Sequence, residues 1–402
     1  MVLEILILAS ALAVAAVLFS PRVRGVKTWK AMSTPLASII GSGFLVLGPL
    51  LSLSYGKYAP LAMVALCAGA YLYGAAIRYN MAAIEVAEAG GGAEPAAVPR
   101  LETASSALLG FAYVISVAYY LNLLGAFGVS LTPFNQPLYA KLLTSAVYGV
   151  ILAVGWTRGF KSLERMEYVS VTVKLAIIAG LLVGLADYFW GTASAGKLVF
   201  NAPTVTGLSA LTLAFGLIVT VQGFETSRYL GANYDRRTRV RSMQWAQWVS
   251  TAIYMVYIVL TAYVFAAGEV KLSETAIVDM MAVVSPILPA MLVAAALAAQ
   301  FSAAIADTSG SGGLFAELTA NRITPKLAYA GLSAIGLGLT WTANVFEIIS
   351  YASCAFALYY AVQAAIAMLY ARRKRETGRA AGFAALALLG LMIVLFGQAV
   401  EA

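Results

Sequence analysis

The sequence predicts an all-α integral membrane protein that crosses the bilayer twelve times. Of its 402 residues, 61% are hydrophobic and only 11% are charged, which is too apolar for the two or three soluble domains that this length would otherwise suggest. The apolar residues lie in stretches of about 20, the length that a helix needs to cross a bilayer. Lys and Arg also concentrate in every second connection between these stretches, as they do in cytoplasmic loops.

The apolar stretches cover nearly the whole chain. The longest connections between them, at 87–103, 190–205 and 268–285, leave no room for a soluble domain, so residues 1–402 form a single membrane domain. We place the twelve spans at 2–20, 31–55, 60–84, 104–129, 138–157, 168–190, 206–230, 244–268, 285–309, 327–343, 346–370 and 380–399.

The distribution of positive charge predicts the orientation. Of the 26 Lys and Arg residues, 21 fall in one set of connections, four fall in the other set, and Lys174 falls within a span. The positive-inside rule then places both termini on the extracytoplasmic side of a multi-pass protein of the cell membrane. The first span is predicted to be retained rather than cleaved, because Glu4 precedes it and the basic segment 21–24 follows it, the reverse of a signal peptide.

Composition also excludes several kinds of chemistry. Histidine is absent, and the two cysteines, Cys67 and Cys354, lie far apart within apolar stretches. These facts argue against a zinc site, a His-based catalytic triad and a disulfide framework. We therefore expect no metal, no cofactor and no enzyme activity. The net charge of +8 belongs to membrane-flanking loops, so nucleic acid is not expected as a partner and membrane lipid is.

The second span contains Gly41, Ser42 and Gly43 near its middle, about 16 Å from Lys30 at 1.5 Å per residue. A helix break there would present backbone N–H groups and the positive end of a half-helix, which suits a carboxylate. Alternatively, the small residues allow two helices to pack closely. The segment alone fits both interpretations.

The seventh span places Gln222, Gly223 and Glu225 together within an apolar run. A carboxylate in the bilayer is costly unless it is paired or lines a polar cavity, so Glu225 is a candidate functional residue. The alternative is a structural ion pair with Arg228, three residues further along the helix.

Two further spans carry charge. Lys174 could extend to the inner interface, whereas Asp307 lies at a similar depth in the ninth span, among Ser302, Thr308 and Ser309. Two separate intramembrane charges would both be expensive, which favours a polar inner cavity that connects them.

These interrupted spans resemble the amino acid, polyamine and organocation (APC) transporter superfamily, whose members have the LeuT-type fold of two inverted five-helix repeats. Ile40 to Phe44 is similar to the break in the family's first core helix, and Gly223 to Glu225 is similar to its sixth. The segment 313–325 is similar to the family's eighth helix and the following proline, whereas 233–241 lacks the prolines of the family's loop. The resemblance implies repeats at 31–190 and 206–370, with additional helices at 1–20 and 380–399.

The resemblance implies a secondary transporter for amino acids or related small amines, a symporter driven by H⁺ or alternatively by Na⁺. It implies that N–H groups at Ser42, Gly43 and Phe44 bind the substrate carboxylate, with Ile40 and Gly41 in the same break. Carbonyls near Val221 and Gln222 would bind the ammonium group, and Phe224 would cover it.

Coupling residues also follow from the resemblance. Lys174 corresponds to a lysine that replaces a sodium ion in proton-coupled members, and Asp307 departs from the family pattern. Sodium-coupled relatives would instead use Ser302, Thr308 and Ser309. Glu225 would orient the broken helix or relay protons. A channel and, after it, a membrane enzyme are the alternatives from other classes. Four polar residues are candidates for determining substrate specificity, but the sequence does not show which way their side chains face: Tyr119, Asn122, Gln300 and Tyr359.

Overall fold

The computed structural model describes residues 1–41, 43–88, 94–157, 161–230, 234–269 and 272–399, without the side chains of 86–88, 161–167 and 269. Throughout these residues the regular structure is helical, as predicted. The helices are α1 (Val2–Phe19), α2 (Pro21–Gly25), α3 (Lys27–Ile39), α4 (Gly43–Tyr55), η1 (Gly56–Tyr58), α5 (Ala59–Glu88), α6 (Val98–Ser130), α7 (Pro137–Thr157), α8 (Lys161–Ser194), α9 (Gly207–Gly216), η2 (Ile218–Val221), η3 (Phe224–Tyr229), α10 (Arg236–Ala262), η4 (Ala267–Glu269), α11 (Ala276–Val284), α12 (Leu288–Leu318), α13 (Pro325–Thr342), α14 (Val345–Arg373) and α15 (Thr377–Phe396).

Nine helical segments of the described chain are long and apolar enough to cross a membrane, so the protein is a multi-pass membrane protein. This criterion does not confirm the count of twelve spans. The second and seventh predicted spans are divided into short pieces, and α13, which begins with Pro325 and Lys326, is not among the nine. The difference therefore arises mainly where helices are broken.

Several helix boundaries differ from the predicted ones. Helix α10 begins at Arg236, so the basic segment that we expected to be a loop forms its first turns, and α12 continues nine residues beyond the predicted end at 309. The apolar stretch ends at the first polar residues, whereas the backbone hydrogen bonds of the helix continue beyond them. The connection 268–285 contains the short helix α11, which we did not predict.

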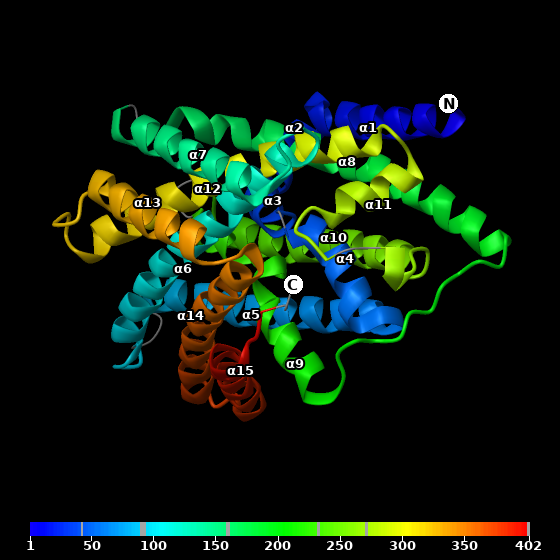
Figure 1. Cartoon of the computed structure of the whole chain (residues 1–402). Helices are drawn as coiled ribbons and strands as arrows, with labels where there is room; N and C mark the ends of the chain where they lie inside the picture. Colours follow the sequence, from blue (N-terminus) through cyan, green and yellow to red (C-terminus); the bar gives the residue numbers. More distant parts are fainter. Residues whose placement is uncertain (42, 89–93, 158–160, 231–233, 270–271, 400–402) are drawn as a thin grey trace.

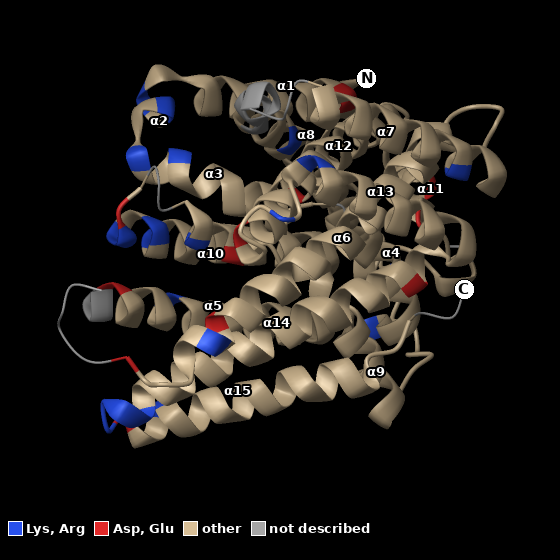
Figure 2. Cartoon of the chain, turned by 90° about the vertical axis from the view of Figure 1, so that its left-hand side faces the viewer, with Lys and Arg blue, Asp and Glu red and all other residues tan. Residues whose placement is uncertain are grey.

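The two predicted additional helices lie on opposite flanks of the bundle. Helix α1 packs along α8, and α15 packs along α14 (Figure 1). Most Lys and Arg residues gather at one end of the molecule, where α2, the start of α10 and the turn between α14 and α15 lie (Figure 2). Helix α1 begins, and α15 ends, towards the opposite end (Figure 2).

Helix α1 is attached to α8 through a narrow seam of small residues. Ile7 and Ala11 are its two buried residues, and a Cβ on Gly180 would lie 2.9 Å from the carbonyl oxygen of Ile7. Gly184 lies one turn further along and contacts the same isoleucine. Glycines four residues apart on one face are the usual means of close helix approach in membranes.

Candidate functional site

The two broken helices meet at the centre of the bundle. The first break follows Ile39, where α3 ends, and the second lies between η2 and η3, where Gly223 adopts φ +115°. A Cβ on Gly43 would lie 2.7 Å from the carbonyl oxygen of Thr220, and a Cβ on Gly223 would lie 2.4 Å from the Oγ of Ser38. The glycines are therefore required by the close approach of one break to the other. Ser42 lies outside the described residues.

Side chains from neighbouring helices bind the backbone groups that the breaks expose. The Tyr254 hydroxyl lies 2.8 Å from the carbonyl oxygens of both Ile39 and Thr220, so one α10 side chain joins the two breaks. On α14, the Ser353 hydroxyl accepts from the N–H of Val219 and donates to the carbonyl of Gly216. Sequence reasoning missed both residues. Their only signal was a hydroxyl in the middle of an apolar span.

Two glutamines near the breaks have unsatisfied amide atoms. Gln222 donates from Nε2 to the Tyr120 hydroxyl at 3.2 Å. Its Oε1, and both amide atoms of the fully buried Gln300, have no hydrogen-bond partner among the described residues. A buried polar atom without a partner costs free energy, on the order of 1–3 kcal/mol. Such atoms in the middle of a membrane protein are candidates for contact with a substrate.

Glu225 is fully buried and binds its own break. One carboxylate oxygen, Oε2, accepts from the backbone N–H of Gly223 at 3.0 Å and from the hydroxyl of Tyr360 at 3.0 Å. The alternative ion pair with Arg228 is wrong, because Arg228 instead pairs with Glu102 of α6. Glu225 binds Gly223 and Tyr360, and Arg228 reaches α6, so contacts from other segments and not the three-residue spacing determine the partners of both side chains.

The aromatic residues of the breaks are packed against tyrosines. Phe224 is fully buried and stacks on Tyr360, with ring centroids 5.2 Å apart. Phe44 packs on Tyr257 with ring centroids 4.3 Å apart. Neither ring lines the two cavities described below.

Lys174 and Asp307 line one cavity beside the end of α3. Lys174 donates to the carbonyl oxygen of Ala37 at 2.8 Å, and Asp307 accepts from the Ser116 hydroxyl of α6. Both side chains are about 95% buried, with 6% and 5% exposure. The cavity leaves about 30 Å³ for water, and its wall also includes Ser38, Ser302 and Thr226. The two charged residues therefore line one cavity, whose wall combines hydroxyl groups with alanine residues.

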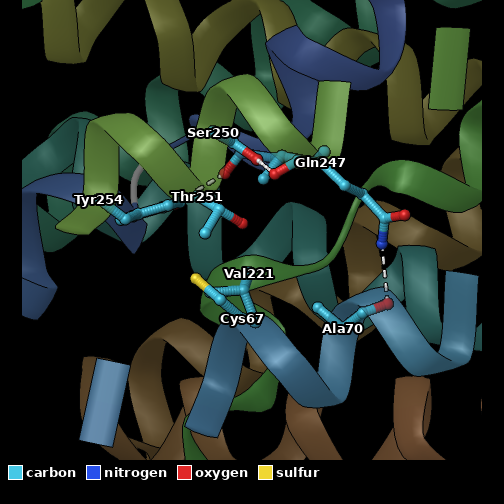
Figure 3. Close-up of a pocket in the computed structure, with 8 residues that line it drawn as sticks. Cys67, Ala70, Val221, Gln247, Ser250, Thr251 and Tyr254 are labelled. Atoms are coloured by element: carbon cyan, nitrogen blue, oxygen red, sulfur yellow. Dashed lines mark hydrogen bonds between the residues drawn. The ribbon is translucent and has the colours of Figure 1, made fainter. Parts of the chain in front are cut away.

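A second, smaller cavity lies on the other side of the end of α3. Figure 3 shows Cys67 and Ala70 of α5, Val221, and the α10 side chains Ser250 and Tyr254 around it. It leaves about 10 Å³ for water. Both cavities are far smaller than the roughly 300–1,000 Å³ of ordinary ligand pockets, so an organic substrate would require the helices to separate.

The remaining candidates divide between packing and polar contacts. Thr308 donates to the Ala304 carbonyl of its own helix, and Ser309 is only partly buried. Asn122 binds Thr340 of α13, and the hydroxyls of Tyr359 and Tyr229 lie 3.5 Å apart. Within the described part of the chain, no group of acidic residues and cysteines could hold a metal ion.

Comparison with known proteins identifies the family and the fold. A family model described as "APC superfamily transporter" matches residues 21–397. An uncharacterized protein of Aquifex aeolicus (strain VF5) is 41% identical over 386 residues, which cover 95% of this chain and 94% of that protein.

A solved structure shows the fold. It is that of MHP1, a nucleobase-cation-symport-1 family transporter in a closed conformation with bromovinylhydantoin bound. It matches with a TM-score of 0.57 and 15% identity, over 92% of each chain. The LeuT-type architecture that we expected is thereby confirmed. On the evidence of the family model, which covers nearly the whole sequence, the chain belongs to the APC superfamily of transporters.

Proposed function

We propose that this protein is a proton-coupled symporter for amino acids or related small amines that works by alternating access. The observation that carries this proposal is the contact between the two broken helices, with Lys174 bound to the Ala37 carbonyl beside them. Unwound segments at the middle of a transporter expose the backbone groups that bind substrate and coupling ions. The segments 31–190 and 206–370 would move relative to each other around this centre.

The substrate carboxylate would bind at the start of α4. The first N–H groups of any helix have no partner within that helix, and the helix dipole there attracts an anion. Gly43 and Phe44 begin α4, next to Ser42, Ile40 and Gly41. This arrangement supports a carboxylate site at the first break.

The substrate ammonium group would bind at the second break. Gln222 and Gly223 lie between two 3₁₀ segments, outside the regular hydrogen bonding of a helix. The unpartnered Oε1 of Gln222 and the carbonyls near Val221 supply acceptors. Phe224 would have to leave its stack on Tyr360 to cover the substrate.

Lys174 would couple transport to protons. Its side-chain nitrogen donates to the carbonyl of Ala37 in the last turn of α3, where positive charge is favoured by the helix dipole. A sodium-coupled symporter of the same fold is the second candidate, because Ser302 and the Asp307 carboxylate supply oxygen ligands in the same cavity.

Uptake into proteoliposomes tests the function. Labelled amino acids and small amines are offered under an imposed pH gradient and, separately, under a sodium gradient. The proposal predicts accumulation driven by the pH gradient. Accumulation driven by sodium alone would favour the second candidate, and no accumulation of any compound under either gradient would contradict both.

We also propose that the protein lies in the cell membrane with its basic end in the cytoplasm and both termini outside. The gathering of Lys and Arg at one end in Figure 2 supports this orientation.

A further inference from the structure

The cavity beside α3 contains two opposite charges in different surroundings. Lys174 reaches it from α8 and donates to the carbonyl of Ala37, in the last turn of α3. Asp307 reaches it from α12 and accepts from Ser116, a neutral hydroxyl. Both side chains are nearly inaccessible from outside, so their charges cannot rely on bulk water.

The groups around Lys174 favour an ammonium ion. Backbone carbonyls at a helix C-terminus carry partial negative charge, and an ammonium group is a stronger donor to them than a neutral amine. Loss of the proton would weaken the bond to Ala37 at the point where α3 ends. Lys174 is therefore suited to remain a fixed cation.

The groups around Asp307 act on its charge in opposite directions, because Lys174 attracts a carboxylate and Glu225 repels one. Its titratable neighbours are Lys174 of α8 across the cavity, Glu225 of η3, and Tyr113 and Tyr120 of α6. Glu225 lies close enough for its charge to act on Asp307. A protonated Asp307 and an ionised one would both have a partner, because Ser116 can either donate or accept.

From this arrangement we propose that the transported proton is carried by the Asp307 carboxyl, while Lys174 acts as a fixed cation. The inference rests on the proton coupling proposed above and assigns the proton carrier and the fixed charge to different residues. A hydronium ion on the proton-rich side gives its proton to an Asp307 oxygen and leaves water, and the reverse step occurs on the other side. The cavity, with about 30 Å³ for water, can hold the one or two molecules that such a transfer needs.

Two transport assays distinguish the roles. Substrate counterflow, without any pH or sodium gradient, measures binding and translocation of the substrate. Accumulation of substrate under a pH gradient measures coupling. One pH unit is worth about 1.4 kcal/mol per proton, enough to concentrate a net-neutral substrate about tenfold at one proton per molecule. Asp307→Asn should lower this accumulation ratio to about one while counterflow remains measurable, because the amide cannot carry the proton.

Lysine variants test the fixed cation. Lys174→Arg should retain pH-driven accumulation, because guanidinium keeps its charge at any relevant pH. Lys174→Met should lose it. Ser116→Ala leaves the Asp307 carboxyl in place, so it should retain coupling with a shifted pH profile of uptake. Asp187→Asn changes an exposed position on α8; it is the control and should match the wild type.

The outcomes separate this inference from the proposed function. If Asp307→Asn accumulates substrate as the wild type does, or if Lys174→Arg abolishes coupling while Asp307→Asn keeps it, the assignment is wrong. Failure of the wild type to accumulate any substrate under a pH gradient would overturn the proton coupling itself, and with it this assignment.

Discussion

Gly223 carries a backbone conformation that other residues rarely adopt. Alanine is unfavourable here for two reasons. The φ of Gly223 is +115°, and the Cβ of an alanine would lie 2.4 Å from Ser38 Oγ. Left-handed backbone and overpacking together cost about 2 to 5 kcal/mol. Gly223→Ala should therefore lower thermal stability in detergent and abolish uptake.

The matched control is Gly149→Ala in α7, where a Cβ meets no atom within 4 Å. It should leave thermal stability and uptake unchanged. If the two alanine variants behaved alike, the close contact between the breaks would not be what determines stability there.

The same residues show how far sequence reasoning reaches. Gly41, Gly223 and Lys174 were predictable because glycine and charge are conspicuous within an apolar helix. Tyr254 and Ser353 were not, because a hydroxyl in a span acquires a role only when a distant helix brings a backbone carbonyl to it. The false pairing of Glu225 with Arg228 arose for a related reason, since Tyr360 and Glu102, which come from distant helices, bind the two side chains instead.

The first helix is held to the bundle by contacts along its length. Ile7 packs on Gly180 and Gly184 of α8, and the Tyr168 hydroxyl donates to the carbonyl of Leu18 and accepts from Trp29 of α3. Helix α1 thus braces the helix that carries Lys174. A leucine at Gly180 would displace Ile7, at a cost of about 1 to 3 kcal/mol.

Gly180→Leu should therefore lower the melting temperature of the purified protein. Gly191→Leu, on the same helix where a Cβ meets nothing within 4 Å, is the control and should have no effect. Equal melting temperatures for all three proteins would show that α1 contributes nothing through this seam.

Helix α10 begins with a charged N-cap at the basic end of the molecule. Hydrogen bonds from the N–H and hydroxyl of Thr238, with a smaller contribution from Lys27, lower the pKa of Asp235 to about 2. Because the folded pKa lies below the ordinary 3.8, the stabilisation is complete above about pH 4 and is lost as the pH falls towards 2.

Asparagine caps helices about as well as aspartate but does not ionise. Asp235→Asn should melt at a lower temperature than the wild type at pH 5, and the difference should shrink as the pH falls to 2. A difference that stayed constant or grew over this range would contradict the role of the charge.

The orientation of the whole chain can be tested with its few cysteines. With Cys67 and Cys354 replaced by alanine, a single cysteine at Gly378, in the first turn of α15, should react with an impermeant thiol reagent only after the cells are opened. A single cysteine at Val2 should react in intact cells. The reverse pattern would invert the proposed topology.

The all-helical membrane fold was predictable from the whole sequence, because hydropathy acts over the length of each helix. The closed packing at the centre was not, since it depends on which faces of α3, α6, α10 and α12 meet. The two cavities beside the end of α3 are too small for an organic substrate, so the helices around them would have to separate for one to enter there. Alternating access is the expected means.

In the proposed mechanism, substrate and protons move together through a centre that contains Lys174. The direct measurement is the pH inside proteoliposomes loaded with a fluorescent pH indicator, recorded as a transported substrate is added outside without a pre-existing gradient. We predict that the lumen acidifies with the wild type and that Lys174→Ala gives no change. Substrate entry without acidification in the wild type, or unchanged acidification in Lys174→Ala, would contradict the account.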